Sequence, residues 1–158
     1  DGGGEDGDLR RQRGLVGGAT SSILSTVALA ALGKKEVGSA YAPTNAVSHW
    51  LYGDKAARHS GPSMRYTVPG YLIHHASATF WSILFERFAG KYLDRNTPVG
   101  MLTAAAATSA FACFADYQLT PRRFRPGYEK HLSKPSLAVV YAGFALGLAA
   151  GAALMRRK

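Results

Sequence analysis

The sequence predicts an all-α integral membrane protein: a four-helix bundle with a short interfacial helix in its first long loop. The first observation is that Pro135 to Met155 holds twenty-one residues without a charge and is followed by Arg156, Arg157 and Lys158. A helix of that length crosses a hydrocarbon core of roughly 30 Å, and its basic end suits lipid headgroups. The second observation is that the other basic residues of this chain, whose net charge is +9, form short clusters beside apolar runs. Such clusters indicate anchoring at anionic headgroups.

The domain organisation follows from the apolar runs. Residues 1–13 begin with a Gly- and Asp-rich stretch and are expected to be a disordered tail. Residues 14–158 are expected to form one transmembrane domain, with spans at about 14–32, 68–88, 99–115 and 135–155.

The expected spans have different compositions. The first contains nineteen uncharged residues from Gly14 to Leu32. The second is interrupted by two histidines and ends in Glu86 and Arg87, which we interpret as an interfacial ion pair. The third is Ala-rich and is closed by Asp116.

The segments between the spans predict where helices begin and how neighbouring spans are arranged. Pro98 and Pro135 stand where proline suits the first turn of a helix. The link between the second and third spans is short, which predicts an antiparallel hairpin. In the longer link that follows the first span, residues 44–52 predict a short helix capped by Thr44. Its Trp50 suggests that this helix lies in the membrane interface.

The hairpin brings polar residues of different spans to one depth. The hairpin midpoint lies near Asp94, and a helix rises by about 1.5 Å per residue. Residues equally distant from the midpoint therefore share a level, and the fourth span and the end of the first, at Ser25 or Thr26, reach the same level. The candidate polar cluster consists of His74, His75, Cys113, Asp116 and Tyr141.

Two interpretations of this cluster stay open. Ionisable residues inside membrane spans are functional candidates, so His74 or His75 with Asp116 could form a proton relay, a metal site or half of a haem ligation. In the structural interpretation, one histidine bonds Asp116 or a backbone carbonyl and ties two spans together. Adjacent helical residues point about 100° apart, so one histidine would face the bundle and the other the lipid interface. Cys113 is expected to pack rather than to react.

Glycines and arginines predict contacts of other kinds. Glycines four residues apart let membrane helices approach closely, so Gly143, Gly147 and Gly151 are expected to face Gly14 and Gly18 or a second subunit in a homo- or hetero-oligomer. A second set, close together after the third span, is expected to meet lipid phosphates: Arg122, Arg123 and Arg125.

The sequence lacks the residues that several classes of protein function require. The single cysteine excludes an internal disulfide and a CxxC motif. The chain contains no phosphate-binding glycine loop, no paired carboxylates for acid–base chemistry and no Ser/His/Asp order. We therefore predict no catalytic residue, no cofactor and no nucleic-acid partner; the expected partner is the lipid bilayer.

Four blocks carry a resemblance to a known group of proteins. The blocks are Ala42-Pro-Thr-Asn-Ala-Val-Ser-His-Trp50, Gly70-Tyr-Leu-Ile-His-His75, Asp116-Tyr-Gln-Leu-Thr-Pro-Arg-Arg123 and Pro126-Gly-Tyr-Glu129. They resemble a group of small bacterial inner-membrane proteins with about four spans and no assigned activity, over most of residues 33–147. The resemblance implies a multi-pass location in a bacterial inner membrane.

Three hypotheses for function remain. The leading one is a non-enzymatic membrane component, structural or interacting with lipid, a partner or a small ligand. The second is a metal-, haem- or proton-handling protein that uses His74 or His75 with Asp116. The third is a soluble helical bundle that binds an acidic partner.

Overall fold

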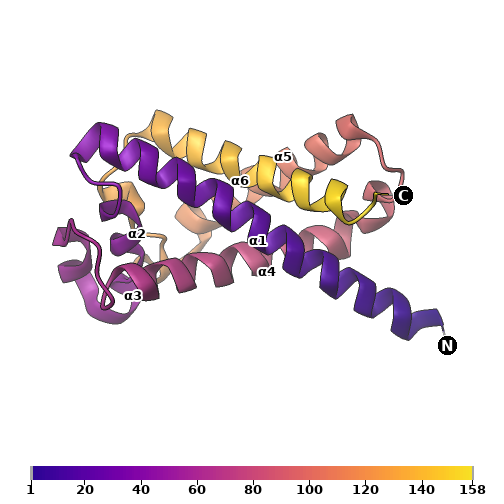
Figure 1. Ribbon diagram of the computed structural model, residues 1–158, viewed down its shortest axis with the longest axis horizontal. Coiled ribbons are helices and arrows are strands. Elements are labelled where there is room, and N and C mark those ends of the chain that lie inside the picture. Colours follow the sequence, from indigo (N-terminus) through magenta and orange to yellow (C-terminus); the bar gives the residue numbers. More distant parts are fainter. Residues whose placement is uncertain (1, 158) are drawn as a thin grey trace.

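Four long helices make up most of the chain (Figure 1). The computed structural model describes residues 2–157, and within them the secondary structure is entirely helical. The long helices run alternately in opposite directions, so that both termini lie at one end. They are α1 (Gly2–Val37), α4 (Thr67–Leu93), α5 (Pro98–Phe114) and α6 (Lys134–Leu154). The expectation of an all-α chain is confirmed.

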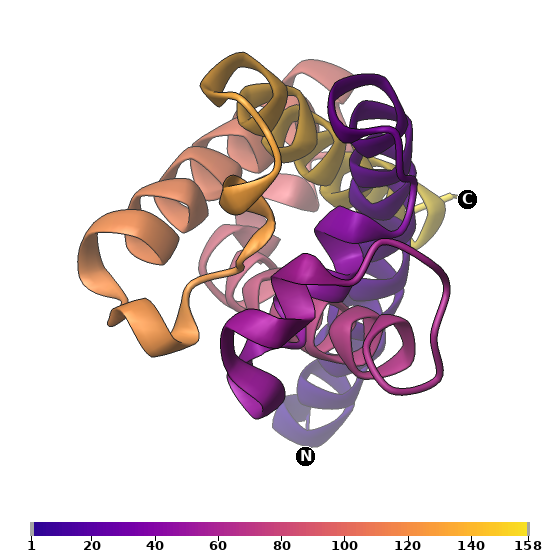
Figure 2. The same ribbon diagram turned by 90° about the vertical axis from the view of Figure 1, so that its left-hand side faces the viewer.

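Short helices gather at the opposite end, here called the loop end (Figure 2). Between α1 and α4 lie α2 (Ala42–Val47), α3 (His49–Tyr52) and the 3₁₀ helix η1 (Gly53–Arg58). Between α5 and α6 lie the π-helical turn η2 (Ala115–Leu119) and the 3₁₀ turns η3 (Arg122–Phe124) and η4 (Tyr128–Lys130). The end that holds both termini is the terminal end.

Three helical segments are long and apolar enough to cross a membrane: Gly3–Val37, Pro98–Leu119 and Lys134–Leu154. Only about a third of each apolar window is buried inside the protein, 33%, 33% and 39% in that order. The helix α4 is not among them.

The outer surface of the bundle is unusually apolar, although large apolar side chains also form its core. Large apolar residues face outward; Leu15 is 58% exposed, Val27 60% and Val99 75%. Small polar residues such as Ser21 and Ser22 are fully buried between helices. Soluble proteins rarely expose large continuous apolar surfaces, whereas a membrane interior favours small residues at helix contacts. The surface of the bundle is thus suited to lipid.

The residues 2–13 differ from the disordered tail that was expected, because they form the first turns of α1. Asp6 pairs with Arg10 four residues later at 3.3 Å, and both Arg10 and Arg13 reach Asp94 at the end of α4, at 3.6 and 2.9 Å. These ion pairs tie the segment to the bundle. Asp1 lies outside the described residues.

The short helix expected at residues 44–52 is divided into two helices, α2 and α3. The expected role of Thr44 as the cap of this helix is wrong. The helix α2 begins at Ala42, and the hydroxyl of Ser39 accepts the N–H of Ala42 at 3.0 Å in its place. All six residues of α2 are buried. A Cβ added at Gly70 of α4 would overlap the carbonyl of Thr44, so α2 packs directly against α4.

The glycines are contact points within the chain. A Cβ at Gly147 would overlap the Cα of Ser21, and one at Gly151 would lie 2.7 Å from the Cα of Gly17, so α6 packs backbone to backbone on α1. The hydroxyl of Thr20 also donates to the carbonyl of Gly147 at 2.6 Å.

The other expected packing glycines lie elsewhere. At Gly143 the nearest atom is 3.4 Å away, an ordinary contact. Gly14 and Gly18 face α4 at Ile83 and Thr79. Their expected pairing with the glycines of α6 is therefore wrong; Gly17, which lies against Gly151 of α6, also faces Ser82 of α4.

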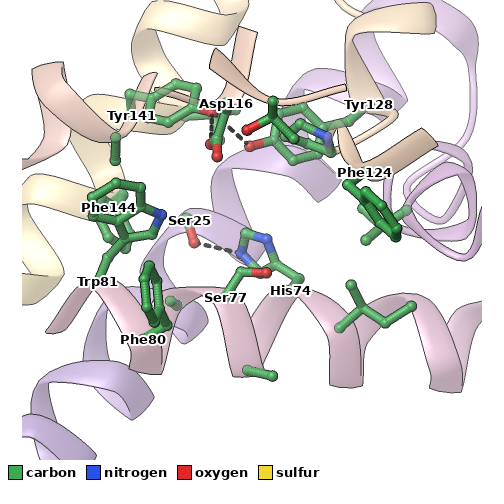
Figure 3. A pocket seen from close by; sticks show the side chains of 18 of the residues that line it. Ser25, His74, Ser77, Phe80, Trp81, Asp116, Phe124, Tyr128, Tyr141 and Phe144 are labelled. Atoms are coloured by element: carbon green, nitrogen blue, oxygen red, sulfur yellow. Dashed lines mark hydrogen bonds between the residues drawn. The ribbon is translucent and has the colours of Figure 1, made fainter. Parts of the chain in front are cut away.

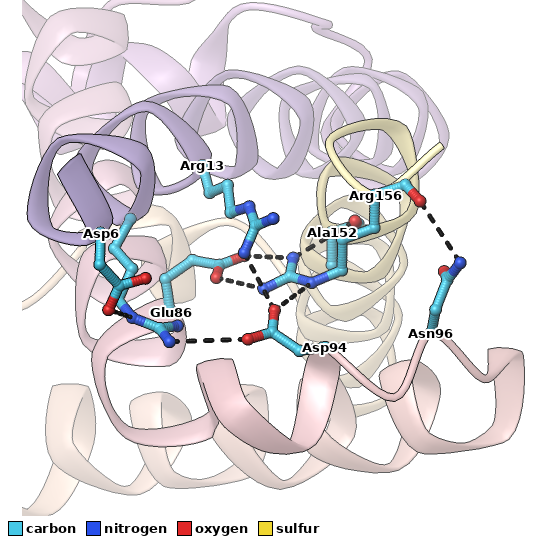
Figure 4. Close-up of polar contacts among 8 residues, drawn as sticks. Asp6, Arg13, Glu86, Asp94, Asn96, Ala152 and Arg156 are labelled. Carbon is cyan, nitrogen blue, oxygen red and sulfur yellow. Dashed lines mark hydrogen bonds and ion pairs between the residues drawn. The ribbon is translucent and has the colours of Figure 1, made fainter. Parts of the chain in front are cut away.

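The expected pair of Glu86 with Arg87 is replaced by a buried pair between α4 and the C-terminus (Figure 4). Glu86 accepts two hydrogen bonds from Arg156, at 2.7 and 2.9 Å, and both side chains are at most 3% exposed. Arg156 also lies 3.1 Å from Asp94. The first residue of the basic C-terminal cluster is therefore inside the protein rather than among headgroups.

Candidate functional site

A cavity of about 450 Å³ lies at the loop end, between α4 on one side and α5 and α6 on the other (Figure 3). Its volume falls in the range of small-molecule sites, roughly 300–1,000 Å³. Aromatic side chains dominate the wall and a few polar groups point inward, which is the usual composition of a ligand site. The aromatic residues are Trp50, Phe80, Trp81, Phe124, Tyr128, Tyr141 and Phe144.

His74 contributes one polar group from α4. Its Nε2 lies 2.7 Å from the Oγ of Ser25, and that hydroxyl lies 2.7 Å from the carbonyl of Ser21. A hydroxyl has one proton and a carbonyl only accepts. The geometry therefore fits Ser25 donating to the carbonyl and accepting from the Nε2–H of His74. In this tautomer Nδ1 is an acceptor, and α1 fixes the orientation of the ring.

Asp116 contributes the second polar group from the opposite wall (Figure 3). The hydroxyl of Tyr141 donates to its carboxylate at 2.5 Å, and the hydroxyl of Tyr128 donates to that of Tyr141 at 3.3 Å. Burial raises the pKa of Tyr128 well above its ordinary value, so its phenol stays neutral and remains a donor. Asp116 lies in the π-helical turn η2; such turns are frequent at functional sites.

The structure divides the expected polar cluster. His74, Asp116 and Tyr141 line one cavity, which is consistent with the common depth expected for them. His75 instead contacts Ser22 and Tyr71, at 3.2 and 3.3 Å, and is half-buried, so both histidines contact serines of α1 but only His74 faces the cavity. Cys113 is half-buried and packs against the core.

The two structural ties expected for the histidines take another form. Asp116 bonds Tyr141 rather than a histidine, and His74 bonds Ser25 rather than a carbonyl. Among residues 2–157, no three His, Cys, Asp or Glu side chains come together in a group that could hold a metal ion. The metal interpretation of His74, His75 and Asp116 gains no support from this arrangement.

The cavity reaches the surface of the bundle. Phe80 and Phe124 both line it, yet they are 56% and 47% exposed. Phe80 lies on the outward apolar face of α4, six residues beyond His74, and Phe124 lies in the loop end. A ligand could therefore enter from the apolar surface and also reach the loop end.

The arginines expected at headgroups lie beside this cavity. Arg122, Arg123 and Arg125 line a second, more polar cavity of about 490 Å³. Trp50 lines both cavities. Its indole N–H donates to the carbonyl of Arg125 at 2.8 Å, which links the wall of one cavity to the backbone of the other.

Sequence reasoning did not identify several lining residues. Ser25 was expected at this level, whereas the hydroxyl of Thr26 is buried without a partner and does not line the cavity. Ser77, Phe124 and Tyr128 were missed. Only Ser77 carried a signal in the sequence, because it lies three residues after His74 and so shares its helix face; the other two sit in an irregular loop.

Comparison with known proteins adds no relative. No family model, no curated protein and no solved structure matches the chain.

Proposed function

We propose that the chain is a membrane protein that binds a long apolar or amphipathic molecule of the lipid class in the cavity between α4 and the helices α5 and α6. The observation that carries this proposal is the aromatic-lined cavity of about 450 Å³ that reaches the outward apolar face at Phe80. A ligand already dissolved in the bilayer enters such an opening without crossing water. This extends the leading hypothesis of a non-enzymatic, lipid-interacting component.

The polar groups in the cavity orient the ligand. His74, held by Ser25, offers an acceptor, and the carboxylate of Asp116 with its Tyr141 partner offers a second polar position. A hydroxyl or carbonyl of the ligand would bond one of them, and the chain would lie along Trp81 and Phe144. Few polar groups among many apolar ones give such a site its orientation.

The proposed location is a bacterial inner membrane, with multiple passes and α4 as the fourth span. The support for α4 is that its two histidines and its glutamate have partners inside the bundle: His74 bonds Ser25, His75 bonds Ser22, and Glu86 pairs with Arg156. Polar groups satisfied in this way cost less in hydrocarbon than isolated ones. The glycine faces of α6 are covered by α1, so the proposed binding unit is one chain.

Intrinsic fluorescence tests the proposal directly, because the only two tryptophans of the chain, Trp50 and Trp81, both line the cavity. Dibrominated octadecanol, an uncharged chain that quenches indole on contact, is titrated into the protein in a neutral maltoside detergent. We expect saturable quenching in the wild-type protein and in the single-tryptophan variants Trp50→Phe and Trp81→Phe.

A matched pair of variants separates cavity binding from partition into the micelle. Ser77→Phe places a ring in the cavity, whereas Leu72→Phe places one on the exposed side of the same helix, where Leu72 is 59% exposed. We expect Ser77→Phe to weaken binding at least tenfold and Leu72→Phe to leave it unchanged. Quenching that rises linearly and equally in both variants would show partition alone and would sink the proposed function.

A further inference from the structure

The second cavity at the loop end is the strongest unexplained feature of the molecule. It has a volume of about 490 Å³ and is mostly polar in its lining. Three arginines from one short stretch enter it, Arg122, Arg123 and Arg125, and Trp50 joins its wall to that of the apolar cavity.

The charges in this cavity do not balance. Lys130 is paired with Asp54 at 2.7 Å, and that hydrogen bond holds the pKa of the Asp54 carboxyl below its ordinary value. Glu129 accepts the backbone N–H of Gly127 at 2.7 Å. Among residues 2–157, none of the three arginines has a carboxylate within 4.0 Å. The lining therefore holds four basic against two acidic side chains, and within the part of the chain that the structure describes the three arginines form no ion pair.

Two of the arginines have contacts that hold them, Arg125 through its backbone and Arg123 through an aromatic ring. The carbonyl of Arg125 accepts from both Trp50 and His49, at 2.8 and 2.5 Å. The guanidinium of Arg123 lies over the ring of Phe124, 5.9 Å from its centroid, and that ring also lines the apolar cavity. Guanidinium groups form bidentate hydrogen bonds with phosphate oxygens. A backbone that is already fixed loses less conformational entropy when the ligand binds.

We infer that the two cavities form one site for an anionic lipid, with its phosphate held by Arg122, Arg123 and Arg125 and its chain in the apolar cavity past Trp50. The inference rests on the proposed function and adds the class of headgroup. The lipid is favoured over free phosphate because the basic cavity shares a wall with the apolar one, and because tryptophan at the loop end suits the headgroup level of a bilayer.

The test compares two probes that differ only in the headgroup. Dibrominated octadecanol and its monophosphate ester are titrated separately in a neutral maltoside detergent, with tryptophan quenching as the readout. We expect the ester to bind at least tenfold more tightly, equivalent to about 1.4 kcal/mol. Added salt should reduce this advantage, because solvent-accessible charges are screened.

Variants of equal charge at the same end of the bundle supply the control. Arg122→Gln with Arg123→Gln should abolish the preference for the ester while leaving binding of the alcohol unchanged. Lys34→Gln with Lys35→Gln removes two exposed charges at the end of α1 and should keep the preference. Loss of the preference in both double variants would indicate a general charge effect and overturn the assignment to this cavity.

The remaining outcomes distinguish the inference from the proposed function. Equal affinity for alcohol and ester in the wild-type protein would overturn the inference and leave the proposed function standing. Absence of saturable quenching by either probe would overturn both. If inorganic phosphate displaces the ester with an inhibition constant equal to the dissociation constant of the ester, the site binds a free anion. That result would overturn the lipid assignment.

Discussion

At the scale of single residues, the pair of Glu86 and Arg156 has the largest expected effect on stability. Both side chains are at most 3% exposed and share two hydrogen bonds. Removing one partner of a buried pair leaves a charge without compensation and costs about 3–5 kcal/mol. We therefore expect Arg156→Met to lower the free energy of unfolding by that amount, measured by denaturant titration in detergent with circular dichroism.

Two further variants check the origin of that loss. The double variant Glu86→Leu with Arg156→Met removes both charges and should recover most of the stability, because an apolar pair can replace a buried ion pair. Arg157→Met changes the exposed neighbour and should be near neutral. A double variant that is no more stable than Arg156→Met alone would contradict this account.

The bond between Asp116 and Tyr141 supports a second prediction at this scale. Asp116→Asn keeps an oxygen that accepts the Tyr141 hydroxyl and should lower stability only slightly. Asp116→Leu leaves that buried hydroxyl without its acceptor, a loss of about 1–3 kcal/mol. Thermal unfolding in detergent measures both; equal tolerance of the two changes would mean that the bond stabilises nothing.

At the scale of helices, the contact of α1 with α6 predicts opposite results for two glycines on one helix. Gly147→Ala places a Cβ onto the backbone of Ser21, which cannot move without shifting α1. Overpacking of this kind costs typically about 1–3 kcal/mol. Gly143→Ala meets its nearest atom at 3.4 Å, and alanine favours a helix over glycine by roughly 0.5–1 kcal/mol.

The measurement is the free energy of unfolding of both variants in the same detergent. We expect Gly147→Ala to be destabilised and Gly143→Ala to equal or exceed the wild type. Equal losses would mean that the helix backbones are not in contact at Gly147.

Helix depth could be predicted from the sequence, but helix rotation could not. The short link and the rise per residue place His74, Asp116 and Tyr141 at one level, and they do line one cavity. The side that each residue faces depends on neighbouring helices, so the polar cluster expected from the sequence included His75 and Cys113, which do not line the cavity. Arg156 was assigned to headgroups because nothing in the sequence indicates that α6 ends beside Glu86.

At the scale of the whole molecule, the number of membrane crossings is the open expectation. Composition identifies three apolar helices and leaves out α4, since its apolar run contains two histidines and Glu86. An average hydropathy counts each of these three side chains as if it had no hydrogen-bond or ion-pair partner, whereas in the fold each of the three has one. A helix whose polar groups are satisfied inside a bundle can cross a membrane despite its lower apolar character.

A crossing by α4 predicts that Lys55, in the connection before it, and Arg95, just after it, lie on opposite sides of the membrane. Cys113 is the only cysteine, so a Cys113→Ala background allows single labels through Lys55→Cys and Arg95→Cys, both at exposed positions. In intact cells, a membrane-impermeant maleimide should modify one of the two variants and not the other, and lysed cells should give modification of both. Modification of both variants in intact cells would place the two positions on one side and reduce α4 to a helix that lies beside the membrane-crossing helices without spanning the bilayer.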